Sequence, residues 1–207
     1  EEKGIKENTI LVYMNDNGGT AGVKTYNAGM RGMKGSNYDG GHRGACFFRY
    51  PAKIKQAKVV HYPSHITDIL PTFIDMLDFE FAANESFDGQ SLKEFVIGSE
   101  SDGDRMFVVQ YGGRIKPKKY YSCVVYNNWR LVGEGELYNL NTDPGQKVDV
   151  IDQFPKIASQ MITYYETWWN EIEPNIEQMV PVVIDLEHEN PTMVTSNTWT
   201  EVDVDNA

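Results

Sequence analysis

The sequence lacks long apolar runs and is poor in positive charge. No stretch reaches the roughly 18 consecutive apolar residues that a membrane-spanning helix needs, so we expect no membrane partner. The Lys and Arg residues number 19 against 30 Asp and Glu, and the net charge is -11. Because such a chain repels a polyanion on average, we expect no nucleic-acid partner, although a local basic group can still hold one small anion.

Cysteine is also scarce. Cys46 and Cys123 lie far apart and form no CxxC pair, which excludes a zinc site built from cysteines. They allow one disulfide or two free thiols, and we expect two buried free thiols. An apolar leader is absent as well, because the chain starts Glu1-Glu2-Lys3 without Met; we expect no signal peptide in this chain and a cut from a longer protein.

What is present suffices for one large domain or two small ones: 207 residues, 41% hydrophobic and 24% charged. Residues 9–14 are a short continuous apolar run, which predicts a strand buried on both faces, as in a parallel sheet. Residues 16–41 hold eight of the 18 glycines and predict a shaped loop. A second strand is expected over residues 45–50, before Pro51.

The remaining chain predicts two helices with short strands between them. Apolar residues at helical spacing over 66–77 predict a helix with Pro71 in its first turn. Loop-forming residues over 78–103 mark a boundary between two layers or subdomains. Beyond it we expect four strands, and then a helix that opens at Pro155 and ends before Pro174. The expected strands cover 105–111, 120–126, 129–132 and 136–140, and the expected apolar stripe of the helix is Phe154, Ile157, Met161, Tyr165, Trp168 and Ile172.

Asp16 and Asn17 directly follow the first predicted strand. Ligands of open α/β sheets bind at the carboxyl ends of strands, and these two side chains offer oxygen atoms suited to a hard cation such as calcium or magnesium. The alternative is a simple turn, because Asn-Gly is a strong turn signal. Two ligands do not complete a shell of about six to eight oxygens, so the others must come from elsewhere.

Lys34 and Arg31 stand among small residues in the segment Gly29-Met-Arg-Gly-Met-Lys-Gly-Ser36. Glycines let the backbone approach an anion, and an ammonium is a good point charge for a sulfate or phosphate oxygen. The segment is not a P-loop, because Gly35 separates Lys34 from Ser36. The alternative is a flexible surface loop with solvated charges.

The histidines are less specific. His42, in the segment Tyr38-Asp-Gly-Gly-His-Arg43, fits an acid, a base, a ligand or a structural residue. His61 and His65 have the spacing of a helical metal pair, but Pro63 between them argues against a helix there. His188 lies in an acidic stretch, where we expect it to be solvated or to make a local hydrogen bond.

Taken in order, these segments resemble the type I sulfatases of the alkaline-phosphatase superfamily. The first residues that carry the resemblance are Asp16-Asn17-Gly18 after a strand, the segment around Lys34, and the segment around His42. The match continues in order to about residue 199, with Phe47-Phe-Arg-Tyr-Pro51, Asp68-Ile-Leu-Pro-Thr-Phe-Ile-Asp-Met-Leu77, Asp88-Gly-Gln-Ser-Leu92, Asn128-Trp-Arg-Leu-Val132, Glu136-Leu-Tyr-Asn-Leu140, Asp143-Pro144, Glu189-Asn-Pro-Thr192 and the segment from Thr195 to Trp199.

The resemblance implies an α/β fold in three parts. Residues 1–103 would form the end of an alkaline-phosphatase-like catalytic domain with a parallel or mixed sheet. Residues 104–174 would form a small α+β subdomain, with a four-stranded antiparallel sheet and a packed helix, and residues 175–207 an extension. The resemblance also implies a periplasmic or extracellular location.

The resemblance further implies a role for each candidate residue. Asp16 and Asn17 would be the last two protein ligands of a calcium ion. Lys34 would contact the sulfate of a sulfate ester, whose leaving group the sequence does not identify, and would neutralise charge on the leaving oxygen. Arg31 and His42 would line the pocket.

The sequence also departs from the family pattern. Asp39 stands where Glu is usual, and Gly145-Gln146 replaces the acidic residue that is common after Asp-Pro. The larger departure is that no C/S-x-P-S-R motif is present, whose Cys or Ser becomes the formylglycine nucleophile. We therefore expect the C-terminal part of a sulfatase (a sulfuric ester hydrolase) that is inactive alone, with no nucleophile in this chain. Formylglycine is expected only in the missing N-terminal part, and the remainder of the sulfatase chain is the expected partner.

Two alternatives remain open on the sequence. One is part of a phosphodiesterase or phosphonate hydrolase of the same superfamily, which would carry an upstream Thr or Ser with extra His ligands. The other is a non-catalytic binding module whose loop holds no metal.

Overall fold

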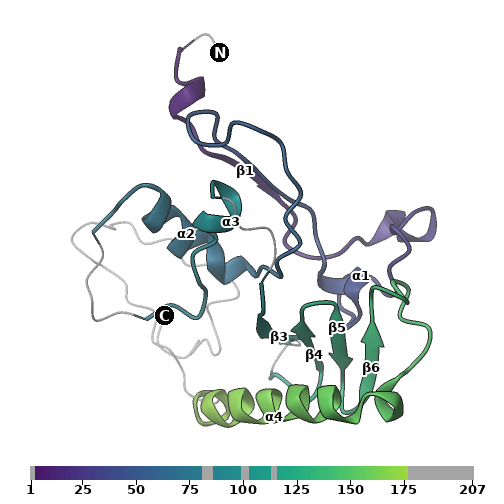
Figure 1. The fold of residues 1–207 in the computed structure, drawn as a ribbon. Coiled ribbons are helices and arrows are strands. Elements are labelled where there is room, and N and C mark those ends of the chain that lie inside the picture. The colour runs from purple at the N-terminus through teal and green to yellow at the C-terminus, as the bar shows by residue number, and fades with distance from the viewer. Residues whose placement is uncertain (1–2, 81–85, 99–102, 113–115, 177–207) are drawn as a thin grey trace, which may run out of the picture. The chain divides into compact units, whose positions relative to one another are not determined.

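The computed structural model describes residues 3–80, 86–98, 103–112 and 116–176 (Figure 1). The chain divides into two compact units, Glu1–Glu171 and Ile172–Ala207. Of the second unit, the end of the last helix and the short 3-10 helix η5 (Glu173–Asn175) are described. Nearly all of the extension predicted over 175–207 lies outside the described residues, including His188 and the family-like segments at 189–192 and 195–199.

The first strands form a two-stranded antiparallel sheet. β1 (Leu11–Met14) pairs with β2 (Cys46–Arg49), and Met14 lies opposite Cys46. Both strands lie where the sequence predicted them, but the expectation of burial on both faces is wrong: Leu11 is 54% and Tyr13 61% exposed. The pairing with β2 satisfies one edge of β1, but side chains project from the two faces, and on this sheet those faces leave Leu11 and Tyr13 exposed.

Short helical segments lie between and around these strands. They are η1 (Lys6–Asn8), η2 (Ala21–Lys24) and α1 (Asp39–His42). The last two interrupt the glycine-rich segment between β1 and β2, which otherwise has no regular structure, as its composition predicted. In this part of the fold, therefore, the chain is positioned by loop contacts rather than by long elements.

The second region holds η3 (Ile66–Asp68), α2 (Ile69–Met76) and α3 (Lys93–Val96). Pro71 lies in the first turn of α2, as predicted, because its missing N–H is not needed there. The predicted apolar stripe was Ile66, Ile69, Leu70, Phe73, Ile74 and Leu77. It is partly wrong: Leu70 and Leu77 are exposed, whereas Thr72 and Met76 are fully buried. The buried side of α2 is therefore the side that holds Thr72, whose hydroxyl donates to the Asp68 carbonyl (2.6 Å) and accepts from the Leu92 amide (2.8 Å).

The third region is a four-stranded antiparallel sheet in the order β3-β4-β5-β6, followed by a long helix, as predicted. The strand limits could be predicted from the turn residues between the strands, and the start of the helix from its proline. Residues 105–111, 120–126, 129–132 and 136–140 were expected as strands. The observed elements are β3 (Met106–Gln110), β4 (Ser122–Tyr126), β5 (Trp129–Val132), β6 (Glu136–Asn139), η4 (Ile151–Gln153) and α4 (Pro155–Ile172).

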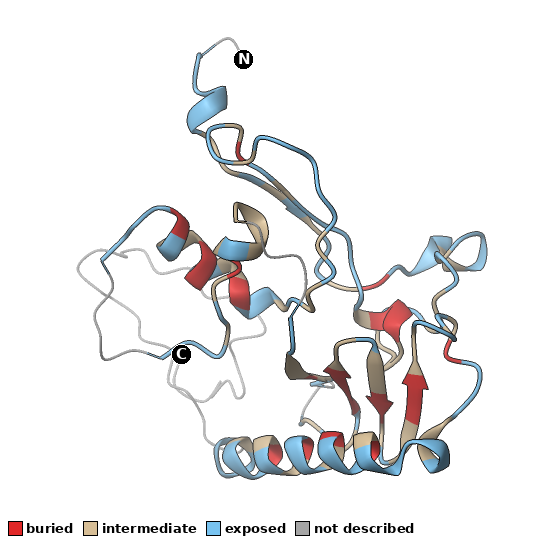
Figure 2. Cartoon of the chain, in the orientation of Figure 1, coloured by how far each residue is buried: buried red, intermediate tan, exposed pale blue. Residues whose placement is uncertain are grey.

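Helix α4 runs along the sheet and turns its buried residues toward it (Figures 1 and 2). Met161 and Tyr165 of the predicted stripe are buried, but Ala158 and Trp169 are buried too, and Phe154 is 40% exposed. Tyr165 also accepts a hydrogen bond from the Tyr120 amide (2.7 Å), which ties the helix to the start of β4. No helix within the described ranges is long and apolar enough to cross a membrane.

The strand register divides the sheet into two faces. Val124, Leu131 and Leu137 are opposite one another, so they share one face. Arg130 and Tyr138 are opposite each other and lie on the other face, with Cys123, Val125 and Val132. That second face packs against Tyr38 of the glycine-rich segment, so the sheet supports the loop that carries the candidate site.

Candidate functional site

The three candidate segments are joined by backbone hydrogen bonds. The Gly18 amide donates to the Gly41 carbonyl (2.9 Å), the Lys34 amide to the Gly19 carbonyl (2.9 Å), and the Gly40 amide to the Arg31 carbonyl (2.8 Å). The turn after β1, the segment around Lys34 and helix α1 therefore lie together. The structure thus brings into one place the motifs that the sequence placed up to 26 residues apart (42 − 16).

Glycine is required at these contacts because the backbones approach too closely for a side chain. A Cβ atom on Gly18 would lie 1.8 Å from the Gly40 carbonyl oxygen, and one on Gly41 would lie 2.0 Å from the Ser36 carbonyl oxygen. A Cβ atom on Gly40 would lie 2.4 Å from the carbonyl oxygen of Gly32. The glycines around the site therefore serve close packing, which disfavours the alternative of a loose surface loop.

Asp16 and Asn17 project from the turn after β1. Asp16 is exposed and Asn17 is half-buried. The Asn17 Nδ2 donates to the Gly18 carbonyl (2.8 Å), which orients the amide and leaves Oδ1 as an acceptor. One carboxylate and one amide oxygen suit calcium in kind, but they are two of the six to eight oxygens it needs.

No group of three or more His, Cys, Asp or Glu side chains that could hold a metal occurs in the described part of the chain. The residues present fit a calcium ion by the chemistry of their oxygens and fall short of it in number. A complete site therefore needs ligands from outside these residues.

The two basic candidates have different surroundings. Lys34 is exposed, and its backbone is fixed by the bond to Gly19. Arg31 is held by the sheet: its Nη1 donates to the Tyr138 hydroxyl (3.0 Å) and to the Gln146 carbonyl (2.9 Å), and its guanidinium carbon lies 3.7 Å from the centre of the Tyr38 ring. Arg31 therefore fastens the loop to the sheet, whereas Lys34 is exposed.

Helix α1 is fixed by a buried carboxylate. Asp39 is fully buried; its Oδ1 accepts from Arg130 Nε (2.7 Å) and its Oδ2 from Arg43 Nη1 (3.3 Å). The Asp39 amide donates to Gln146 Oε1 (2.8 Å), so a side chain from the loop after β6 occupies the start of the helix. Gln146 is itself fully buried, and its φ of 48° is unusual for a residue with a side chain.

Arg130 and Gln146 were not recognised from the sequence as part of this site. The sequence showed Gln146 only as a departure from the family pattern, and the positions of Asp39 and Gln146 are 107 residues apart. The departures at Asp39 and Gln146 were the available signals, because a shorter carboxylate needs a different partner arrangement.

His42 ends α1 and is largely shielded from water. Its Nε2 is buried and has no hydrogen-bond partner among the described residues, while the ring bonds the backbone of Asn37. Burial lowers the pKa of His42, and the nearby Asp39 offsets part of that effect. The imidazole is therefore neutral at pH 7, and its buried Nε2 is left without a hydrogen bond among the described residues.

The remaining candidates do not form a second centre. Cys123 is buried, and burial raises its pKa to about 12, so it carries no thiolate. Cys46 is exposed, so the expectation of two buried thiols is wrong for Cys46, and both thiols are free. His65 accepts from the Thr67 amide at the start of η3. Residues 61–65 are not helical, as Pro63 predicted.

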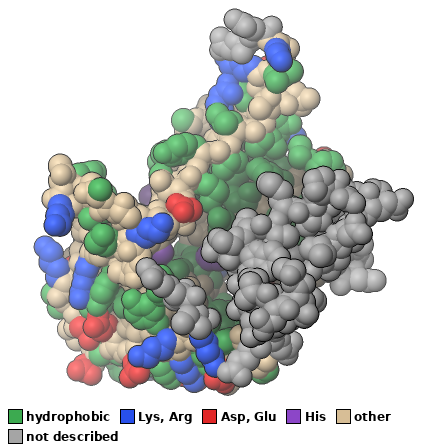
Figure 3. Space-filling model, turned by 180° about the vertical axis from the view of Figure 1, so that it is seen from behind, with side chains coloured by type: hydrophobic (Ala, Val, Ile, Leu, Met, Phe, Trp, Pro, Cys, Tyr) green, Lys and Arg blue, Asp and Glu red, His purple; other side chains and the backbone are tan. Residues whose placement is uncertain are grey.

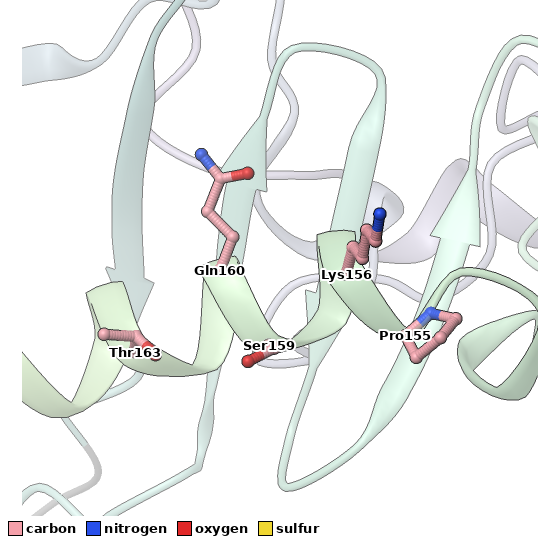
Figure 4. Close-up of a pocket in the computed structure, with 5 residues that line it drawn as sticks. All are labelled: Pro155, Lys156, Ser159, Gln160 and Thr163. Atoms are coloured by element: carbon pink, nitrogen blue, oxygen red, sulfur yellow. The ribbon is translucent and has the colours of Figure 1, made fainter.

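A shallow depression of about 530 Å³ lies on α4 (Figure 4). It is lined by residues of that helix alone: Pro155, Lys156, Ser159, Gln160 and Thr163. Because a single helix face offers no enclosure and no convergent polar groups, this depression is not the chemical site.

Comparison with known proteins agrees with these observations. The family model described as Sulfatase matches residues 1–79. The chain is 31% identical over 206 residues to Arylsulfatase J of Mus musculus, covering 77% of this chain and 34% of that protein. It is 27% identical over 152 residues to Steryl-sulfatase of Mus musculus, covering 70% of this chain and 24% of that protein. The chain thus spans between about a quarter and a third of the length of these relatives.

Solved structures show the same fold. Ps i-CgsB in complex with k-i-k-neocarrahexaose matches with a TM-score of 0.69 and 24% identity, over 81% of this chain and 38% of that one. The PsFucS1 sulfatase from Pseudoalteromonas sp. matches with a TM-score of 0.66 and 20% identity, over 86% of this chain and 40% of that one. These likenesses confirm the predicted fold class.

Proposed function

Because this chain belongs to the sulfatase family and spans part of such a protein, we propose that it supplies one side of a sulfate-ester hydrolase site. Asp16 and Asn17 provide two oxygen ligands for calcium, and Lys34 meets the sulfate group. The observation that carries this proposal is the hydrogen bond from the Lys34 amide to the Gly19 carbonyl. It holds Lys34 beside the turn that bears the proposed calcium ligands Asp16 and Asn17.

The residues divide the work by their chemistry. A bound calcium ion would supply positive charge next to the sulfate. Asn17 already presents its oxygen, because its amide nitrogen is bonded to Gly18. The Lys34 ammonium adds three donors and a charge that stabilises the negative charge developing on the leaving oxygen. His42, which is neutral, would line the pocket from the end of α1.

The nucleophile lies outside this chain in this proposal. The sequence has no C/S-x-P-S-R motif, and the Cys123 thiol is buried with its pKa raised to about 12. Formylglycine would come from the N-terminal part of the protein, and the chain alone would not turn over sulfate esters. A periplasmic or extracellular location, which the family resemblance implies, belongs to the same proposal.

The remainder of the sulfatase chain is the proposed partner of the uncovered apolar surface. Figure 3 shows hydrophobic side chains gathered on one face of the molecule. The exposed large apolar side chains of β1, β2 and α2 are Leu11, Tyr13, Phe47 and Leu70. Exposed apolar surface of this kind marks an interface. It supports a first domain over 1–103 that is completed by another part of the protein. The subdomain at 104–174 and the extension at 175–207 follow this domain in the proposal.

The test uses the full-length protein with formylglycine in place. Asp16→Ala removes a metal ligand, so calcium content and sulfate-ester turnover should fall together. Lys34→Ala should lower turnover about 100-fold or more while calcium stays bound, because an ammonium cannot be a ligand. Lys24→Ala, an exposed lysine of η2, is the matched control and should change neither. Full calcium and full turnover in Asp16→Ala would show that Asp16-Asn17-Gly18 is only a turn.

A further inference from the structure

The turn that carries Lys34 is closed by its own hydrogen bonds. The Ser36 amide donates to the Met33 carbonyl (2.9 Å), and the Met33 amide donates to the Ser36 hydroxyl (3.2 Å). Lys34 is exposed, and its ammonium bonds no described residue. The direction in which this ammonium points therefore depends on how the backbone of the turn is held.

Two side chains, one on each side of this turn, reach strand β6. Arg31, three residues before Lys34, donates from Nη1 to the Tyr138 hydroxyl (3.0 Å). Tyr38, four residues after Lys34, donates from its hydroxyl to Glu136 Oε2 (2.7 Å). The Tyr138 hydroxyl donates to the same carboxylate oxygen (2.7 Å). Both flanks of the turn therefore converge on Glu136, which is 98 residues from Tyr38 in the sequence.

The chemistry of these contacts suits a fixed anchor. Tyr138 is 3% exposed and Glu136 is half-buried. Burial, and then the bond to Glu136, raises the pKa of both Tyr38 and Tyr138, so both phenols are protonated donors at neutral pH. Hydrogen bonds to an ionised acceptor are stronger than those between neutral groups. One carboxylate thus holds two hydroxyls, and one of these hydroxyls holds Arg31.

We propose that Glu136 is a positioning residue for Lys34. Through the hydroxyls of Tyr38 and Tyr138, it holds both flanks of the lysine turn. This assignment rests on the function proposed above, in which Lys34 meets the sulfate. It gives the small subdomain at 104–174 a part in turnover, although Glu136 itself touches no substrate. The competing explanation is that the close-packed glycines alone hold the turn, and the tests below separate the two.

The first test follows the turn itself in the 207-residue chain, independently of activity. Trypsin cleaves after Lys34 when the turn opens, so the rate of native-state cleavage there reports local order. Tyr138→Phe removes the hydroxyl that joins Arg31 to Glu136, and should speed this cleavage at least about tenfold. Cleavage after Lys24, an exposed lysine of η2, should stay unchanged, which separates local opening of the turn from unfolding of the chain.

A matched control comes from another tyrosine hydroxyl. Tyr164→Phe removes a hydrogen bond of 2.9 Å to the Met106 carbonyl, between α4 and β3, and should change neither cleavage rate. If Tyr138→Phe lowers the melting temperature more than Tyr164→Phe does, Tyr38→Phe replaces it, because it removes the other hydroxyl from Glu136.

The second test asks whether Glu136 acts through Lys34, in the full-length protein with formylglycine in place. Glu136→Leu removes both acceptor oxygens and should lower kcat at least about tenfold while bound calcium stays unchanged. Glu136→Gln keeps one acceptor oxygen and should restore part of the loss. In a Lys34→Ala background, Glu136→Leu should lower kcat less than about twofold further, because the lysine that it positions is gone.

Three results would overturn the assignment. They are equal cleavage after Lys34 in the wild type and the tyrosine variant, full turnover in Glu136→Leu, and an equal loss from Glu136→Leu with and without Lys34. If Lys34→Ala loses turnover while Glu136→Leu keeps it, this assignment alone is wrong. Full turnover in Lys34→Ala would overturn the function proposed above and this assignment with it.

Discussion

Replacing Arg130 with methionine removes the main partner of a buried carboxylate. Asp39 is fully buried and Arg130 is 11% exposed, with 2.7 Å between Arg130 Nε and Asp39 Oδ1. Leaving a buried charge without its partner costs about 3–5 kcal/mol. Arg43 still contacts Asp39 at 3.3 Å and offsets part of that cost. We therefore expect Arg130→Met to lower the free energy of unfolding by about 3 kcal/mol, or the melting temperature by about 6–12 °C.

The structure supplies its own control for this experiment. Arg43→Met removes a second guanidinium from the same carboxylate, but Arg43 is 60% exposed and its bond is longer. Solvent screens that interaction, so its loss should cost less than about 1 kcal/mol. Urea unfolding followed by tryptophan fluorescence measures both variants. A larger loss in Arg43→Met than in Arg130→Met, or a loss under about 0.5 kcal/mol in Arg130→Met, would refute the reasoning.

Two further predictions concern the loop itself. Gly18→Ala places a Cβ 1.8 Å from the Gly40 carbonyl oxygen and should destabilise the chain by about 2 kcal/mol or more in urea unfolding. The control Gly22→Ala, whose added Cβ meets nothing within 4 Å, should cost less than about 1 kcal/mol. Equal effects would mean that the close approach is absent. Burial lowers the pKa of His42 in the folded chain, so its contribution to stability is present above the unfolded pKa of about 6.5 and is lost as pH falls through the lower folded pKa. Between about pH 7 and pH 5, the free energy of unfolding of His42→Asn should therefore fall less than that of the wild type. Parallel curves for the two proteins would contradict a shielded imidazole.

The elements of the third region could be predicted because each carries a local signal. Asn-rich and Gly-rich turns separate the strands, and Pro155 opens α4. The faces of the helices were harder to predict. In α4 the buried tryptophan is Trp169 rather than Trp168, and in α2 a threonine is buried while Leu70 is exposed. Which face is buried depends on the element that covers it, and helical spacing alone does not identify that element.

The candidate site shows the same division. Asp16, Asn17 and Lys34 were recognisable because their residue types and neighbours suggest ligand chemistry. Arg130 and Gln146 were not, because an arginine in a strand and a glutamine after a turn have many ordinary uses. Their importance comes from a carboxylate 91 residues from Arg130 and an amide 107 residues from Gln146.

The sequence by itself determined the types and order of the elements, the oxygen and ammonium candidates, and the absence of a nucleophile motif, because these depend on residues close together in the chain. The tertiary structure decided which glycines are needed for close approach. It also decided that Arg31 fastens the loop and that Arg130 is the shielded partner of the buried Asp39. Burial and pairing of this kind arise only when segments distant in the sequence meet. The free-energy cost of burying a charge or a polar atom, and the partner that offsets this cost, both depend on the residues that folding brings around it.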